Sequence, residues 1–162
     1  MIKPLSIAER LMGMNDTVWA RHANPWSVWS RFSILPLFVL AVWSRLWIGW
    51  WALALVALVC AWTWLNPRVF PAPKRLGTWA SKVVLGEQLY LTRKGEVDAH
   101  HIRATFWLGL MTVPAALVMA WGLWAFWWEW AVFGMMLVMI SKTWFCDRMV
   151  WIYEDLTPQE EA

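Results

Sequence analysis

The chain has 162 residues, of which 60% are hydrophobic and only 15% charged. A mean hydropathy of +0.45 is higher than the surface of a water-soluble domain usually tolerates, so we predict an integral membrane protein. The net charge of +3 does not indicate nucleic-acid binding, because the basic residues are scattered among apolar residues and follow no single helix or strand. Membrane lipid is therefore the expected partner, and nucleic acid is not.

The N-terminal region is expected to stay in the mature protein, since it contains charges throughout and no apolar run typical of a cleavable signal peptide. Ser6 followed by Glu9 has the form of a helix capping box, which predicts a short interfacial helix over Ile7 to Met14. Asn24 and Pro25 then predict a helix start, with asparagine as the cap and proline at the first helical position.

The first apolar block predicts two membrane crossings, over residues 26–44 and 46–65. The second of them holds no charge, and about twenty residues at ~1.5 Å each span the ~30 Å hydrocarbon core. Pro36 predicts a kink in the first crossing. The pair Asn66-Pro67 predicts the end of the second, because proline cannot continue the helical hydrogen bonds.

The second apolar block predicts two further crossings, over 105–128 and 130–145. Glu129 marks the turn between them, as Arg45 marks the turn of the first block, and we expect these two side chains to approach one another if the hairpins pack side by side. Beyond residue 145 the pattern becomes amphipathic, so the fourth helix is expected to extend past the membrane. The predicted fold is all-α, an integral membrane four-helix bundle of two transmembrane hairpins with short interfacial helices.

Charge and tryptophan placement predict the orientation of this single membrane domain. All Lys and Arg residues except Arg45 fall on the side that the two hairpins share with the chain termini, which the positive-inside rule assigns to the cytoplasm. The cytoplasmic segments are then 1–25, 66–103 and 146–162, in what we expect to be a prokaryotic cytoplasmic membrane. Half of the 18 tryptophans lie near the two turns and half near the opposite interface, as four crossings require.

The central polar segment predicts two helix starts and a docking surface. Thr78 is a suitable cap for a short helix to about Gly86, and Asp98 for the third long helix. The tail after residue 145 carries an acidic face. We expect it to dock on cationic residues of the central segment, among them Arg68, Arg75, Lys82 and Arg93.

Candidate chemistry is confined to the cytoplasmic side. The three histidines do not have a diagnostic metal-ligand spacing, and adjacent histidines on a helix diverge by about 100°, so no metal site is predicted and the cofactor stays unknown. Cys60 and Cys146 are expected to be free thiols on the reducing side. The spans lack a central ionisable group, which argues against an ion pathway. An interfacial pocket is the remaining candidate site, formed by Arg21, His22, Asn24, Arg68, Glu87, His100, His101, Asp147 and Arg148.

Several strings follow one another in a specific order: RHANPWS from Arg21, NPRVFP from Asn66, VLGE from Val84, the pair His100-His101, and WFCDRMVW from Trp144. In this order they resemble an uncharacterised prokaryotic family of small membrane proteins of unknown function. The resemblance covers nearly the whole chain, implies the membrane architecture and implies no activity.

Three classes of function stay open at this point. The first is a structural, accessory or lipid-interacting membrane protein without chemistry of its own. The second is a small membrane enzyme or ligand-binding protein that uses the interfacial pocket, and the third is a transporter or channel subunit. Whether the partner is a second copy of the chain or another membrane protein also stays open.

Overall fold

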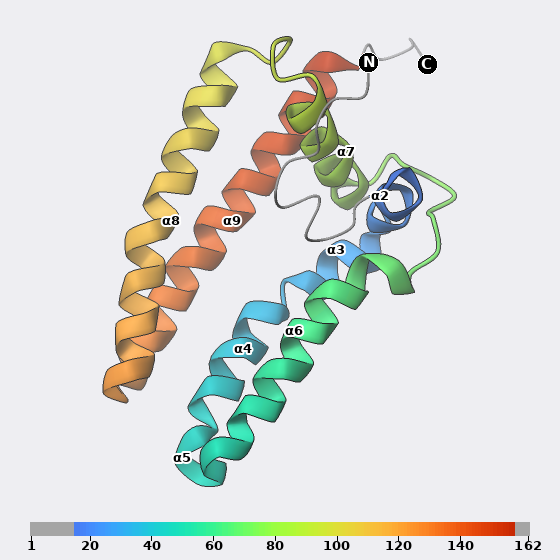
Figure 1. The fold of residues 1–162 in the computed structure, drawn as a ribbon. Coiled ribbons are helices and arrows are strands. Elements are labelled where there is room, and N and C mark those ends of the chain that lie inside the picture. The colour runs from blue at the N-terminus through green and yellow to red at the C-terminus, as the bar shows by residue number, and fades with distance from the viewer. Residues whose placement is uncertain (1–14, 158–162) are drawn as a thin grey trace.

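The protein is all-helical over residues 15–157, the part of the chain that the computed structural model describes (Figure 1). The predicted helix over Ile7 to Met14 lies outside these residues. The all-α prediction is confirmed. In chain order the elements are α2 (Asp16–His22), α3 (Pro25–Arg31), α4 (Ile34–Trp43), α5 (Arg45–Ile48), the short 3-10 helix η1 (Gly49–Trp51), α6 (Ala52–Val69), α7 (Trp79–Thr92), α8 (Ala99–Ala125) and α9 (Trp128–Leu156).

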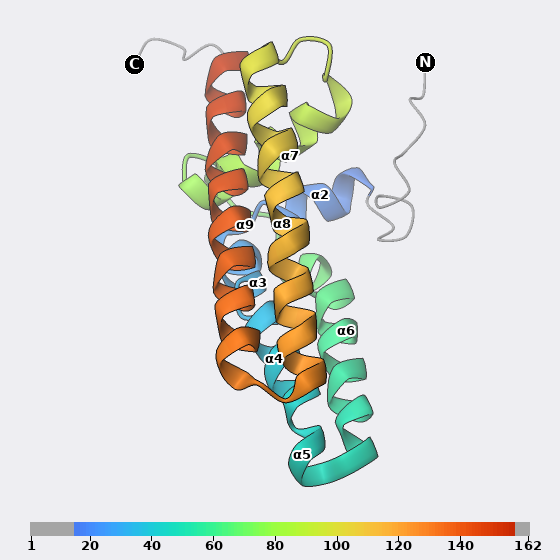
Figure 2. The same cartoon turned by 90° about the vertical axis from the view of Figure 1, so that its left-hand side faces the viewer.

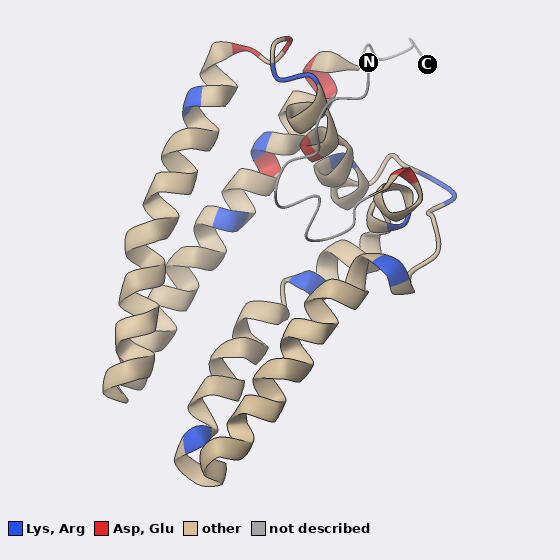
Figure 3. Cartoon of the chain, in the orientation of Figure 1, with Lys and Arg blue, Asp and Glu red and all other residues tan. Residues whose placement is uncertain are grey.

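Two antiparallel helical hairpins dominate the architecture, one made of α4 and α6 and the other of α8 and α9 (Figures 1 and 2). Helix α7 packs along the C-terminal half of α9, and the short helices α2 and α3 connect it to the α4–α6 hairpin. Most charged residues lie in the half of the molecule that holds α2 and α7, whereas Arg45 of α5 and Glu129 of α9 lie at the two hairpin turns (Figure 3).

The predicted helix starts are largely confirmed. The Asn24 side chain accepts a hydrogen bond from the backbone N–H of Trp26, with Pro25 at the first helical position of α3. Thr78 accepts from the N–H of Ser81 at the start of α7.

The expected end of α7 near Gly86 is wrong. The helix runs on to Thr92, because this glycine lies against the backbone of Met149 in α9 and lets the two helices approach closely.

The two proline predictions in the first hairpin have different outcomes. The first crossing is interrupted at Phe32 and Ser33, between α3 and α4, one turn before Pro36, because this proline has no N–H for the carbonyl of Phe32 and its ring crowds that carbonyl. Pro67 does not end α6, which continues to Val69. One carbonyl of this last turn has a distant partner, since the Arg21 guanidinium donates to the carbonyl of Arg68 at 3.1 Å.

The two hairpin ends meet through Arg45, but not through Glu129. Helix α8 ends at Ala125, Phe126 takes a left-handed conformation, and Glu129 lies in the first turn of α9. Arg45 donates to the carbonyls of Leu123 and Trp124, and its guanidinium lies 4.3 Å from the centre of the Phe126 ring. No ion pair joins Arg45 to Glu129 within residues 15–157. The carbonyls that end a helix carry partial negative charge, so they accept the cation without a carboxylate.

The acidic face of the tail packs on α7. Lys82 Nζ lies 2.6 Å from Glu154 Oε1, and the indole N–H of Trp79 donates to Asp147 at 3.2 Å. Of the four cations expected to receive the tail, Lys82 is the one in an ion pair with it among the described residues. The contact holds the end of α9 against the central segment.

The surface of both hairpins is strongly apolar. Two helical stretches, Pro25–Val69 and Ala99–Ala125, are long and apolar enough to cross a membrane. Few of these side chains are buried by the rest of the protein, and Trp47, Trp50 and Trp51 expose 74%, 87% and 78% of their surface. A water-soluble core helix would hide such residues.

The close approach of α8 and α9 yields a direct test. A Cβ on Gly134 would overlap the backbone of Met119 and Ala115, whereas a Cβ on Gly109 would meet open space. We expect Gly134→Ala to lower the free energy of unfolding by about 1–3 kcal/mol, because neither backbone can yield cheaply. Gly109→Ala, the matched control, should leave stability unchanged or raise it by about 0.5–1 kcal/mol. Thermal unfolding in mild detergent measures both, and equal midpoints for the two variants would contradict the packing.

Candidate functional site

The nine candidate pocket residues lie in three separate places. Arg21, His22, Asn24 and Arg68 belong to the junction of α2, α3 and α6, where His22 also faces a cavity that it shares with Glu87. The second place, at the start of α8 and in the C-terminal part of α9, holds His100, His101 and Arg148. Asp147 faces Trp79 on another side of α9. One pocket does not contain all nine.

A buried polar cluster joins the first hairpin to α2, and we call it the Asn66 cluster: His22, Ser27, Ser30, Arg31 and Asn66. Ser27 and Asn66 are completely buried. The hydroxyl of Ser27 donates to Asn66 Oδ1 at 2.9 Å, and Asn66 Nδ2 donates to the hydroxyl of Ser30 at 2.7 Å. The amide of Asn66 therefore makes a hydrogen bond through both its oxygen and its nitrogen, as burial demands.

The same cluster determines the tautomer of His22. Because the Ser27 hydroxyl gives its hydrogen to Asn66, it can only accept from His22 Nδ1, which lies 3.2 Å away. His22 Nε2 then has a free lone pair, which accepts from the Arg31 guanidinium at 2.6 Å. Burial, assisted by the positive charges of Arg31 and Lys142, lowers the pKa of His22 from 6.5 to about 3. The imidazole is neutral at physiological pH.

Polar side chains around the cluster bind backbone carbonyls of distant segments. Asn24 Nδ2 donates to the carbonyl of Pro71 at 2.9 Å, and the Ser81 hydroxyl donates to the carbonyl of Ala23 at 2.8 Å. These bonds attach the chain after α6, and the start of α7, to the loop between α2 and α3. The RHANPWS and NPRVFP strings thus meet in one structural junction.

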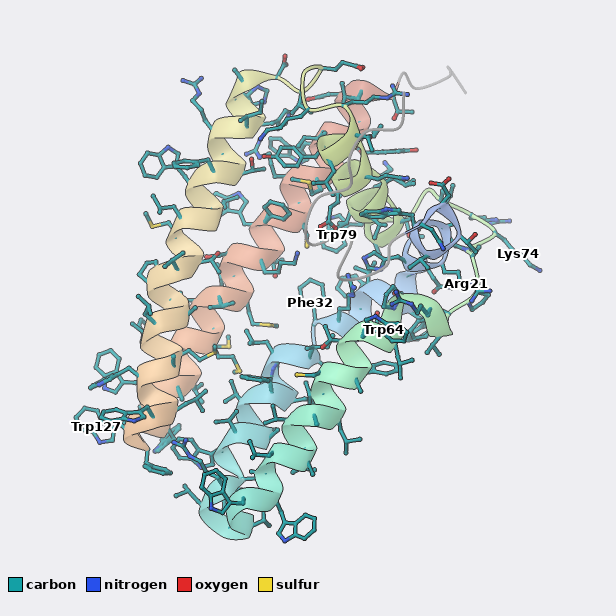
Figure 4. All side chains as sticks on the ribbon, viewed as in Figure 1. Arg21, Phe32, Trp64, Lys74, Trp79 and Trp127 are labelled. Atoms are coloured by element: carbon teal, nitrogen blue, oxygen red, sulfur yellow. The ribbon has the colours of Figure 1, made fainter. Side chains whose placement is uncertain are left out.

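A cavity of about 500 Å³ lies beside this junction, between the two hairpins. Residues of α2 and α3, of the turn that follows, and of α4, α7, α8 and α9 line it. Phe32 lies in the space between the hairpins (Figure 4). The size is typical of sites for small ligands, which range over about 300–1,000 Å³.

The ionisable groups of the cavity are Arg31, Glu87, Lys142 and Cys146, beside the neutral His22. Arg31 is largely buried, has no carboxylate within ion-pair distance among the described residues, and its Nε lacks a hydrogen-bond partner. Burial raises the pKa of the Cys146 thiol, which therefore stays protonated and is a poor nucleophile. The cavity carries two cations against one carboxylate.

A second polar group surrounds His101, which is 1% exposed. Its Nε2 lies 2.7 Å from Asp155 Oδ2, and Arg148 approaches its Nδ1 at 3.5 Å. Since a guanidinium can only donate, Nδ1 accepts and Nε2 carries the hydrogen that binds Asp155. The donor atoms of His100, His101 and Asp155 lie within 4.8 Å of one another, which makes this the group in the described residues most able to hold a metal ion.

Sequence reasoning missed the residues that organise the junction. Ser27, Arg31, Asn66 and Lys142 were not among the nine candidates, although each lies in the Asn66 cluster or the cavity wall. Arg31 and Asn66 are polar residues within or at the end of an apolar block, and such positions are costly unless a partner exists. The cost of a polar residue in an apolar block was therefore the one sequence signal for these positions. It does not reveal which residue is the hydrogen-bond partner.

The shifted pKa of His22 predicts a pH-dependent stability. Between about pH 3 and 6.5 the unfolded chain protonates this histidine and the folded protein does not, so the free energy of unfolding falls as the pH falls through this range. The slope approaches ~1.4 kcal/mol per pH unit for one proton. His22→Gln keeps an acceptor for Arg31 but cannot titrate, and should lose this component. Unfolding midpoints of both proteins from pH 7 to 4.5 measure the difference. Parallel curves would reject the buried neutral imidazole.

The comparisons with known proteins yield one match. Residues 6–162 match DUF6653, which is described as a family of unknown function. No curated protein and no solved structure matches the chain.

Proposed function

Because the chain belongs to this family of unknown function, we propose a role from its own residues: a four-crossing membrane protein with a lipid-interacting or structural task. The α4–α6 and α8–α9 hairpins each cross twice, as a four-helix bundle. The chain termini, α2 and α7 lie on the cytoplasmic side of a prokaryotic cytoplasmic membrane. The task requires no catalysis.

The observation that carries this proposal is the exposed apolar surface of the hairpins together with the placement of charge. Leu53, Leu58 and Leu117 each expose at least 60% of their surface on long helices without neighbouring charges. Lipid is the solvent that makes such exposure favourable. Apart from Arg45, the cations lie in the half of the molecule that holds α2 and α7 (Figure 3), as the positive-inside rule expects for the cytoplasmic side.

The tryptophans support the same arrangement. Trp127 lies at the turn of the α8–α9 hairpin, and Trp64 and Trp79 lie near the charged end (Figure 4). The indole ring is favoured at the headgroup boundary, where its apolar face is buried and its N–H stays hydrated. Two aromatic belts, one at each end of the hairpins, are what a spanning protein requires.

A second candidate function is a ligand-binding protein or enzyme with a metal at the cytoplasmic interface. The convergence of His100, His101 and Asp155 favours it. It predicts that protein purified without chelator carries close to one zinc ion per chain by elemental analysis, and that His101→Gln carries none. We expect no stoichiometric zinc, because the buried ring of His101 already has a hydrogen-bond partner in Asp155. One zinc ion per chain would favour the ligand-binding or enzymatic function.

Accessibility to a membrane-impermeant maleimide tests the four crossings. In a background without Cys60 and Cys146, Glu129→Cys should react in intact cells, because the α8–α9 turn faces outward. Lys74→Cys, in the exposed segment before α7, should react only after permeabilisation. Both are exposed positions, so each serves as the other's control for reactivity. Labelling of both in intact cells, or the reverse pattern, would contradict the topology.

A further inference from the structure

The cavity between the hairpins is amphipathic along the long axis of the molecule. On α9, Lys142 and Cys146 lie toward the charged end, whereas Val138 and Met139 lie toward the hairpin turn. On the opposite wall Arg31 lies toward the charged end, and Leu35 lies toward the hairpin turn. A molecule that fits this cavity has a charged group at one end and an apolar body at the other.

The charge of the cavity selects an anion. Arg31 and Lys142 face Glu87 alone, and His22 is neutral, so the polar end has one unbalanced positive charge. Neither cation has an ion-pair partner among residues 15–157. The Arg31 guanidinium is held toward this region by its bond to His22 Nε2, and its Nε has no acceptor. Arg31 is partly buried and Lys142 is exposed, and Glu87 is the one carboxylate of the described residues that faces them in the cavity, so an anionic ligand would gain a charge-assisted hydrogen bond there.

We propose that this cavity binds one acyl chain of an anionic phospholipid, with the phosphate against Arg31 and Lys142 and the chain along Phe32, Leu35 and Met139. The inference rests on the proposed membrane placement, which puts the polar end of the cavity at the level of the cytoplasmic headgroups. A lipid of that leaflet then enters with its natural orientation.

Gly109 permits a test that does not depend on removing a stabilising contact. It lines the cavity, and a Cβ at this position meets no atom within 4 Å. Gly109→Leu therefore places a branched side chain into the space of the acyl chain without overlap of the backbone, and leucine favours the helix more than glycine does. Gly109→Ala leaves most of the cavity open and serves as the control.

The experiment is native mass spectrometry of the full chain from mild detergent, with phosphatidylglycerol or phosphatidylcholine added. We expect the wild type and Gly109→Ala to retain one phosphatidylglycerol. Gly109→Leu should retain none while unfolding at the same or a higher temperature than the wild type. Phosphatidylcholine, whose head group has no net charge, should bind at least about ten-fold more weakly.

A charge variant tests the head-group contact. Lys142→Gln should reduce retention of phosphatidylglycerol by about ten-fold, since a charge-assisted hydrogen bond is lost. Lys74→Gln removes an exposed cation far from the cavity (Figure 4) and should change nothing. Lys142 is preferred to Arg31 because Arg31 also binds His22.

Three results would overturn the inference: equal retention of the two phospholipids, undiminished retention by Gly109→Leu, or binding of inorganic phosphate as tightly as phosphatidylglycerol. Palmitate binding with the same dependence on Gly109 and Lys142 would support the shared chemistry and make a free fatty acid the source. The maleimide experiment tests the membrane topology separately from the lipid site. If its topology holds and no amphiphile is retained, the cavity assignment alone fails.

Discussion

The burial of Asn66 between the first hairpin and the helices that precede it is the interaction on which the rest of the molecule depends. Its amide oxygen accepts from Ser27, and its nitrogen donates to Ser30. Because the Ser27 hydroxyl can then only accept from His22, Nδ1 of His22 carries the hydrogen. Nε2 of the same ring accepts from Arg31. A completely buried polar group left without partners costs about 1–3 kcal/mol, so the arrangement holds only as a whole.

This cluster also explains how the two ends of the structure differ. At the charged end, side chains of the α2–α3 region bind carbonyls in the last turn of α6 and in the chain that follows it, and α7 is attached to α9 by Lys82 and Glu154. At the opposite end the hairpins meet where Val39 of α4 packs against Leu123 and Ala131, and where Arg45 reaches the last carbonyls of α8. Between these two attachments the hairpins separate enough to leave the cavity, with Arg31 at its polar end. The lipid proposal follows from this geometry and charge.

Much of the architecture could be predicted from the sequence, because local rules determine it. Apolar runs predicted helices, and Asn24 and Thr78 marked starts that the structure confirms. Prediction failed where a distant partner decides the outcome. Helix α6 continues past Pro67 to Val69, where Arg21 binds the carbonyl of Arg68, and Arg45 binds helix-end carbonyls and forms no ion pair with Glu129 among the described residues. The candidate residues were drawn from the predicted cytoplasmic segments, but the helices distribute them over three places, and their spacing in the sequence does not show that separation.

The most direct measurement is a crystal structure from a lipid mesophase doped with phosphatidylglycerol whose acyl chains carry bromine. The account predicts anomalous bromine density inside the cavity, beside Phe32 and Met139, and further bromine around the exposed faces of α4, α6 and α8 between the two tryptophan belts. A cavity without bromine would contradict the lipid site. If the apolar helix faces instead packed against one another in a water-soluble fold, with no bromine near them, the membrane placement itself would be contradicted.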